Sequence, residues 1–254
     1  MNTDVKPSES YRDQIRRWAH ALATADIDQL EDSLDDGSNL DHVALFVDGN
    51  MAKRDSLLLT LLPFLAGLIE ELPEWIVNYA TACPFPAQGT GVNDADTCLA
   101  WLERNQKMTR EQRDYVACQR ARHAVEATGR ANRVGHIEFQ KLARRAVGFA
   151  DALETNADLE VHVNPIHVWT RFQTAALLDE SATAPADVLF FAAGSDIGTA
   201  VLEPAARRAV RELAVNGPWT IDSWSCLTEH ADRDELITLC RDLAQIGLVA
   251  FVNL

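Results

Sequence analysis

The sequence contains no long uninterrupted apolar run, no closely spaced cysteine pair and no excess of positive charge. The longest apolar stretch, residues 56–69, is broken by Pro63 and is shorter than the roughly 20 residues that a membrane-spanning helix needs. Residues 1–10 are polar and lack the apolar centre of a signal peptide. We therefore expect no membrane segment, no export and a cytoplasmic location.

Cysteine is sparse and scattered. An odd number of cysteines in a reducing compartment argues against a disulfide framework, and a zinc site would need closer ligand pairs than these spacings supply. Free cysteines are among the most buried residue types. We expect free, mostly buried thiols and no metal site at the five positions Cys83, Cys98, Cys118, Cys226 and Cys240.

The net charge of -15 disfavours nucleic acid as a partner, because nucleic-acid affinity comes largely from Lys and Arg. The charges are nevertheless segregated into blocks along the chain. Residues 104–145 hold 11 basic and 4 acidic residues, net +7, between acidic regions on either side. This basic belt is either a solvated face folded against acidic neighbours or a docking surface for an acidic partner. Its candidate docking residues are Arg110, Arg113, Arg120, Arg122, Arg130 and Arg133.

The first 155 residues show helical spacing of apolar residues, and a hydrophobic content of 47 % is enough for a packed core. Thr109 and Gln112 form a candidate capping box at the start of the longest helical pattern, which Gly129 is expected to stop. A turn is expected near residues 48–50. The Leu-rich segment that follows should form either a pair of helices divided at Pro63 or one helix kinked there. The expected helical segments are 11–34, 54–79, 93–102, 109–128 and 136–153, with a loop at 83–91.

Beyond a seam at 155–158 the pattern changes from helical to alternating. Residues 159–163 and 166–172 predict a hairpin around Asn164 and Pro165, followed by a third strand at 187–192. Three helices and a last strand follow, at 202–215, 220–228, 232–246 and 248–252. The predicted fold class is therefore α+β: an all-helical domain over 1–155 and a module with a small antiparallel sheet over 156–254.

The order of hairpin, third strand and three helices resembles the winged-helix-like recognition elements of pathways that modify ribosomally made peptides. The resemblance rests on "LEPAARRAVRELAVNGPWTIDSW" and "DELITLCRDLAQIGLVAF". In the N-terminal half, "LFVDGNMAKRDSLLLTLLPFL" and "WIVNYATACPFPAQGTGVNDADTCLAWL" resemble the helical domain of partner subunits of multinuclear non-haem iron-dependent oxidases. Those partners accompany a TIM-barrel oxidase in methanobactin and 3-thiaglutamate biosynthesis.

The resemblance implies a non-catalytic partner protein, in a heterodimer with a TIM-barrel multinuclear iron oxidase. Such a partner binds the leader region of a precursor peptide and presents a residue, here expected to be a cysteine, for oxidation. Iron would sit on the oxidase, and no cofactor is expected on this chain. Two alternatives stay open: a winged-helix transcription regulator, which the acidic segment 232–246 disfavours, and a free-standing enzyme with an unrecognised site.

A peptide-binding strand needs an open sheet edge and side-chain pockets beside it. The resemblance places the leader peptide against the third strand and the last helix. The residues so implied are Val188, Leu189, Phe190, Phe191, Leu236, Leu239, Cys240 and Leu243. Because a strand has two faces, at least half of these side chains are expected to form the core, and the exposed ones are the candidates.

No arrangement of nucleophile, base and orienting residue is recognisable in the sequence. His162 and His167 lie five apart without a persuasive third ligand, so we interpret them as surface or turn histidines. Residues 194–198 have a glycine-rich pattern but lack the Lys and the spacing of a phosphate-binding loop, and we expect a turn.

Overall fold

The computed structural model describes residues 40–83, 91–156, 158–179, 182–227 and 232–253. Its contacts divide the chain into two compact units, 1–108 and 109–254. Of the helices expected over 11–34, only Arg12, Asp13, Arg16, Ala19 and His20 are described, all helical. Most of the expected loop at 83–91 lies outside the described residues. None of the described helices is both long enough and apolar enough to cross a membrane.

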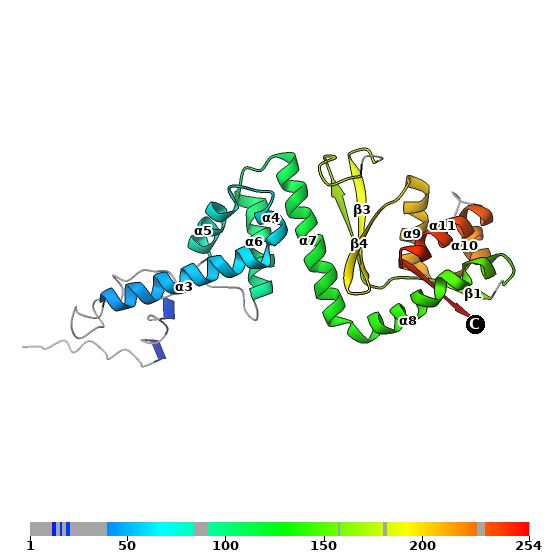
Figure 1. Ribbon diagram of the computed structural model, residues 1–254, viewed down its shortest axis with the longest axis horizontal. Coiled ribbons are helices and arrows are strands. Elements are labelled where there is room, and N and C mark those ends of the chain that lie inside the picture. Colours follow the sequence, from blue (N-terminus) through cyan, green and yellow to red (C-terminus); the bar gives the residue numbers. More distant parts are fainter. Residues whose placement is uncertain are drawn as a thin grey trace, which may run out of the picture. The chain divides into compact units, whose positions relative to one another are not determined.

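The described part of the first unit consists of four helices: α3 (Leu40–Leu61), α4 (Pro63–Ala66), α5 (Leu72–Ala82) and α6 (Gly91–Asn105) (Figure 1). Pro63 separates α3 from α4, as predicted. The turn expected at 48–50 is wrong, since α3 runs through it. A single mid-helix glycine costs only about 1 kcal/mol relative to Ala, and Gly49 has nothing within 4 Å of its missing Cβ.

The second unit begins with α7 (Arg110–Ala131), α8 (Arg133–Phe149) and the short helix η2 (Ala150–Glu154). The capping box is confirmed: Gln112 N donates to Thr109 Oγ1 over 3.1 Å, and Thr109 N donates to Gln112 Oε1 over 2.9 Å. The helix runs two residues beyond Gly129, the expected stop.

Asp114 fixes α7 to the sheet region of its unit. Its carboxylate accepts from the backbone N–H groups of Gln173 and Thr174 and from the Thr174 hydroxyl, at 2.6–3.1 Å. Farther along, Ala146 of α8 belongs to the same buried cluster as the C-terminal helices. These contacts explain why the chain divides at Met108 and Thr109, whereas the sequence suggested 155–156.

Two small antiparallel sheets follow. One has the order β5 (Trp219–Thr220), β1 (Leu159–Val163), β6 (Val249–Asn253), and the other has the order β2 (His167–Phe172), β3 (Ala186–Ala193), β4 (Asp196–Val201). The three predicted C-terminal helices are confirmed as α9 (Pro204–Asn216), α10 (Ile221–Leu227) and α11 (Arg233–Gln245). The chain thus combines a helical region with small antiparallel sheets.

The hairpin predicted around residues 164 and 165 is wrong, because β1 and β2 lie in different sheets. Asn164 is fully buried and lies where the chain passes from the first sheet to the second. Its backbone N–H donates to Leu248 O over 2.8 Å, its side chain donates to Ala192 O over 2.7 Å, and its Oδ1 accepts from Ile166 N over 2.9 Å. One residue therefore bonds to both sheets and carries the chain from one to the other.

The sequence also missed β4. The predicted turn is confirmed only at Gly194 and Ser195, where Gly194 has a φ of 65°. Residues 196–201 form β4 and pair with residues 188–193 of β3. Gly198 is required there, because a Cβ at this position would lie 2.5 Å from the ring of Phe191, its cross-strand neighbour.

Helices flank both faces of the β2–β3–β4 sheet, as Figure 1 shows, with α7 on one side and α9 and α11 on the other. Leu189 and Phe191 lie in one buried cluster with residues of α9 and α11. On the opposite face, Ala192 and Ile197 lie beside Val125 of α7. The two faces are thereby occupied, which leaves the edges of this sheet as its accessible backbone.

Candidate functional site

β4 is an edge strand of the β2–β3–β4 sheet. Within the described residues β4 pairs only with β3. The two-residue turn is closed by Ala193 and Asp196, and bonded and non-bonded pairs alternate from there. Every second residue of β4 therefore points its N–H and C=O away from β3: Ile197, Thr199 and Val201.

A groove of about 690 Å³ runs beside this edge, between β4, the start of α9 and the last turns of α11. Apolar residues that line it are Val201, Leu202, Leu239, Leu243 and Ile246. The segment between β2 and β3 also contributes to the lining, and the acidic residues Asp179, Glu203 and Asp242 border the groove. Val201 and Ile246 are large apolar residues that remain 44 % and 42 % exposed. The groove thus combines unpaired backbone with exposed apolar surface, the two requirements for binding an extended chain.

Charged residues form the end of the groove near α9. Asp187 accepts from Arg207 over 2.6 Å and has Arg211 at 3.5 Å and Arg171 at 4.0 Å. Arg211 also stacks on Trp169, with its guanidinium carbon 4.7 Å from the ring centre. These contacts hold α9 against the sheet and so fix the width of the groove.

The strand that the sequence analysis assigned to the peptide has no open edge. β3 is the central strand, hydrogen-bonded on both sides, so it has no open edge. The sequence analysis counted 159–163 as the first strand of this sheet and therefore stopped one strand short of the edge. Seven of the eight predicted peptide-binding residues are buried at 3 % exposure or less: Val188, Leu189, Phe190, Phe191, Leu236, Cys240 and Leu243.

Only Leu239 of that set is partly exposed, and it lines the groove together with Leu243. The sequence reasoning missed the residues that complete the groove, Thr199, Val201, Arg207 and Ile246. Their only signal was the weak alternation after Gly194, which a glycine and two small residues obscure.

The predicted basic belt is accessible. Arg110, Arg113 and Arg120 are exposed and recur on one face of α7, since residues three, seven and ten apart share a face of a helix. Arg122 is half-buried, and Arg130, at the end of α7, lies 3.7 Å from Glu126. Arg133 begins α8.

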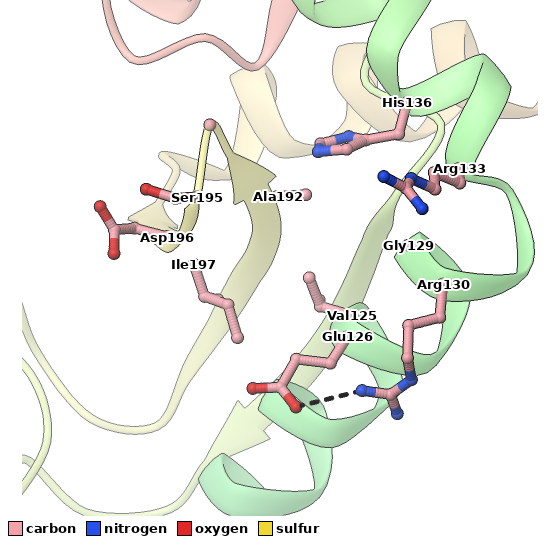
Figure 2. Close-up of a pocket in the computed structure, with 11 residues that line it drawn as sticks. Val125, Glu126, Gly129, Arg130, Arg133, His136, Ala192, Ser195, Asp196 and Ile197 are labelled. Carbon is pink, nitrogen blue, oxygen red and sulfur yellow. Dashed lines mark ion pairs between the residues drawn. The ribbon is translucent and has the colours of Figure 1, made fainter.

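A second hollow, of about 370 Å³, lies where α7 meets α8 (Figure 2). Arg130, Arg133 and His136 border it on the helix side, and the β3–β4 turn borders it on the other. The Nδ1 atom of His136 is buried and has no hydrogen-bond partner among the described residues. In Figure 2 the Asp196 carboxylate points away from the hollow.

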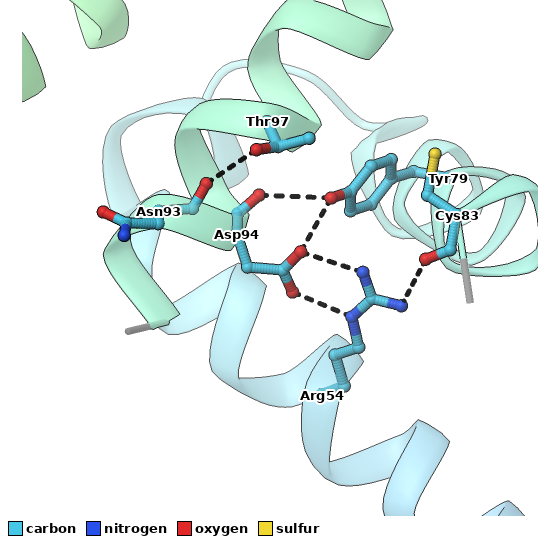
Figure 3. A network of polar contacts seen from close by, with 6 residues as sticks. All are labelled: Arg54, Tyr79, Cys83, Asn93, Asp94 and Thr97. Atoms are coloured by element: carbon cyan, nitrogen blue, oxygen red, sulfur yellow. Dashed lines mark hydrogen bonds and ion pairs between the residues drawn. The ribbon is translucent and has the colours of Figure 1, made fainter. Parts of the chain in front are cut away.

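The first unit contains a buried polar network of its own (Figure 3). Arg54 makes two hydrogen bonds of 2.8 Å to Asp94, and its third nitrogen donates to Cys83 O over 2.7 Å. Tyr79 Oη donates to Asp94 Oδ1 over 2.7 Å, and burial together with this bond raises the Tyr79 pKa. The network fastens α3, α5 and α6 together.

Thiol reactivity should follow burial. Desolvation raises the pKa of Cys98 to about 12 and that of Cys118 to about 11, and it also raises the Cys240 pKa. These thiols stay protonated at pH 8, and the thiolate is the reactive form. Cys226 is exposed. Native protein treated with N-ethylmaleimide at pH 8 should be modified at Cys226 at least tenfold faster than at Cys98, Cys118 or Cys240, as peptide mass spectrometry would measure.

Unfolding in urea should remove this difference, because all thiols then approach their ordinary pKa near 8.5. Equal native rates at Cys226 and Cys240 would contradict the burial described above.

The histidines noted in the sequence have local partners. His162 Nε2 lies 3.2 Å from Glu160, and His167 Nδ1 lies 2.6 Å from Asn164 O. Among the described residues no group of three or more His, Cys, Asp or Glu side chains could hold a metal ion.

The chain matches no protein-family model and no curated protein.

Proposed function

We propose that this protein binds a ribosomally made precursor peptide as an added strand on β4. The observation that carries the proposal is the groove between the open edge of β4 and α11. Residues 167–245 contain three antiparallel strands followed by three helices, with the two-residue strand β5 between α9 and α10. Apart from β5, this is the order of the resembled recognition elements. In those elements the leader peptide lies against the third strand and the last helix. By this count β4 and α11 are those two elements.

The proposed partner is a TIM-barrel multinuclear iron-dependent oxidase, which would hold the iron and oxidise the presented residue, expected to be a cysteine. The role of this chain is to position the peptide. Holding two reactants in a productive geometry can supply roughly 7–11 kcal/mol of a barrier. The exposed arginines Arg110, Arg113 and Arg120 on α7 support docking of an acidic surface, because such patches steer association.

The groove is tested with a peptide and two matched variants. Ile246→Asp places a charge on the apolar wall, whereas Val215→Asp places one on an α9 residue that is 80 % exposed and does not line the groove. An unpaired carboxylate in an apolar contact costs about 1–3 kcal/mol, so we expect Ile246→Asp to weaken peptide binding roughly 5- to 150-fold.

The measurement is fluorescence anisotropy with labelled leader peptides of such oxidase pathways and with peptides selected from a random displayed library. Val215→Asp should bind like the unaltered protein. Equal binding by both variants would reject the groove as the site, and failure to retain any peptide would reject peptide recognition itself.

Partner docking has a separate test. Co-purification with a TIM-barrel oxidase of this class should survive Arg144→Glu on α8 and be lost in the triple variant Arg110→Glu, Arg113→Glu, Arg120→Glu. Retention of the oxidase by the triple variant would place the docking surface elsewhere.

A further inference from the structure

The hollow at the junction of α7 and α8 lies along the same edge strand as the groove. Ile197 lines the hollow, and Thr199 lines the groove. Both residues point their backbone groups outward from β4. Successive outward positions are about 7 Å apart at the rise of a β-strand. A peptide added to β4 would therefore pass from the groove directly into the hollow.

The two sites lie on opposite faces of the sheet. Ala200 packs against the buried cluster that includes α9 and α11, whereas Ile197 lies beside Val125 of α7. In paired strands, directly opposite side chains point to the same face. A peptide residue opposite Ala200 thus points into the groove, and one opposite Ile197 points into the hollow. These two peptide positions are three residues apart.

The hollow has the chemistry of an acid-binding subsite with an apolar floor. Arg133 is exposed and has no acidic partner among the described residues, and it stands in the first turn of α8, where the helix dipole favours an anion. His136 also borders the hollow. Arg130 already faces Glu126 at 3.7 Å, which leaves Arg133 as the principal cation. Val125, Ala192 and Ile197 supply apolar contact.

Building on the proposed function, we infer that the bound peptide carries an Asp or Glu side chain in this hollow, three residues from an apolar side chain in the groove. All strands of this sheet are antiparallel, and antiparallel pairing is slightly the more stable per residue. In that direction the apolar residue comes first, so the recognised pattern is apolar-x-x-acidic. Arg133 selects the acid, and Leu239 and Ile246 select the apolar residue.

The experiment uses a random dodecapeptide library displayed on phage and selected on the full-length protein. Selected peptides are made with the acidic residue and with its amide, Asp→Asn or Glu→Gln, and their affinities are measured by fluorescence anisotropy. Arg133→Gln should weaken binding of the acidic peptide by up to about fivefold and leave the amide peptide unchanged, the signature of a direct pair in a double-mutant cycle. The control, Arg144→Gln, changes an exposed arginine of the same helix outside the hollow.

Three results overturn the inference in distinguishable ways. If the selected peptides depend on Ile246 but carry no acidic residue three positions after the apolar one, that result rejects the acidic subsite and leaves the proposed peptide binding intact. If Arg133→Gln and Arg144→Gln have equal effects, or if acidic and amide peptides lose affinity equally, Arg133 acts only through general charge attraction and not through a direct pair. A library that yields no binder sensitive to Ile246→Asp overturns the proposed function together with the inference.

Discussion

Replacing Thr199 by proline is expected to weaken peptide binding at least tenfold while leaving the protein folded. By the alternation of the hairpin, the Thr199 N–H points away from β3 and is free to donate to an added strand. Proline removes this donor and places its ring where the peptide backbone would lie. Proline is tolerated on an edge strand when its N–H would have faced solvent, so we expect a stability cost of no more than about 1 kcal/mol.

Two neighbouring substitutions serve as controls for this result. Thr199→Ala keeps the N–H and should bind peptide like the unaltered protein. Ala200→Pro removes a donor directed at β3 and should lower the free energy of unfolding, measured with urea, by more than Thr199→Pro does. If Thr199→Pro binds peptide as tightly as Thr199→Ala, the peptide does not pair with β4.

The second large effect is expected in the helical unit, where Asp94→Ala should lower the free energy of unfolding by about 3–5 kcal/mol. The side chains of Arg54 and Asp94 are only 10 % and 4 % exposed. Removing the carboxylate leaves a buried guanidinium without its counter-charge and takes away the acceptor of the Tyr79 hydroxyl. Most single substitutions cost far less, so a loss of this size identifies a broken buried network.

Two further variants distinguish the stability effect of breaking the network from the effect of losing one negative charge. Glu70→Ala removes an exposed carboxylate from the same unit and should change stability by less than about 0.5 kcal/mol. The double variant Arg54→Met, Asp94→Leu should recover much of the loss, because an apolar pair leaves no buried charge uncompensated. A urea transition for Asp94→Ala that coincides with that of Glu70→Ala would contradict the buried pair.

Local signals in the sequence predicted most of the helices. Pro63 ended α3 because proline cannot continue a helix, and the Thr109 capping box placed the start of α7 to the residue. The strand pairing was not predictable in the same way. Residues 159–172 alternate like a hairpin, but their partners lie far along the chain, and the buried hydrogen bonds of Asn164 that separate them depend on tertiary structure.

The candidate site was predicted only in part, for the same reason. The last helix was identified and Leu239 lies in the groove, yet the edge strand was assigned to β3. A central strand is apolar on both faces, which made residues 188–192 the most conspicuous segment. β4 alternates weakly, because Gly198 must leave space for the ring of Phe191 and Thr199 is exposed. A strand edge is accessible when no other strand pairs with it. Strand pairing depends on segments far apart in the chain, so the pattern of one segment does not predict it.

The β1 strand has a consequence for how the second unit folds. Leu159 pairs with Asn253 and Glu160 pairs with Thr220, so the sheet closes only when segments far apart in sequence meet. Such high contact order slows folding, because the entropy of closing a long loop is lost before the contacts are gained. The helical unit, whose contacts are more local, should therefore reach its native state first. During synthesis, α7 and the β2–β3–β4 meander would exist before their covering helices, and that interval is when this unit is most exposed to aggregation.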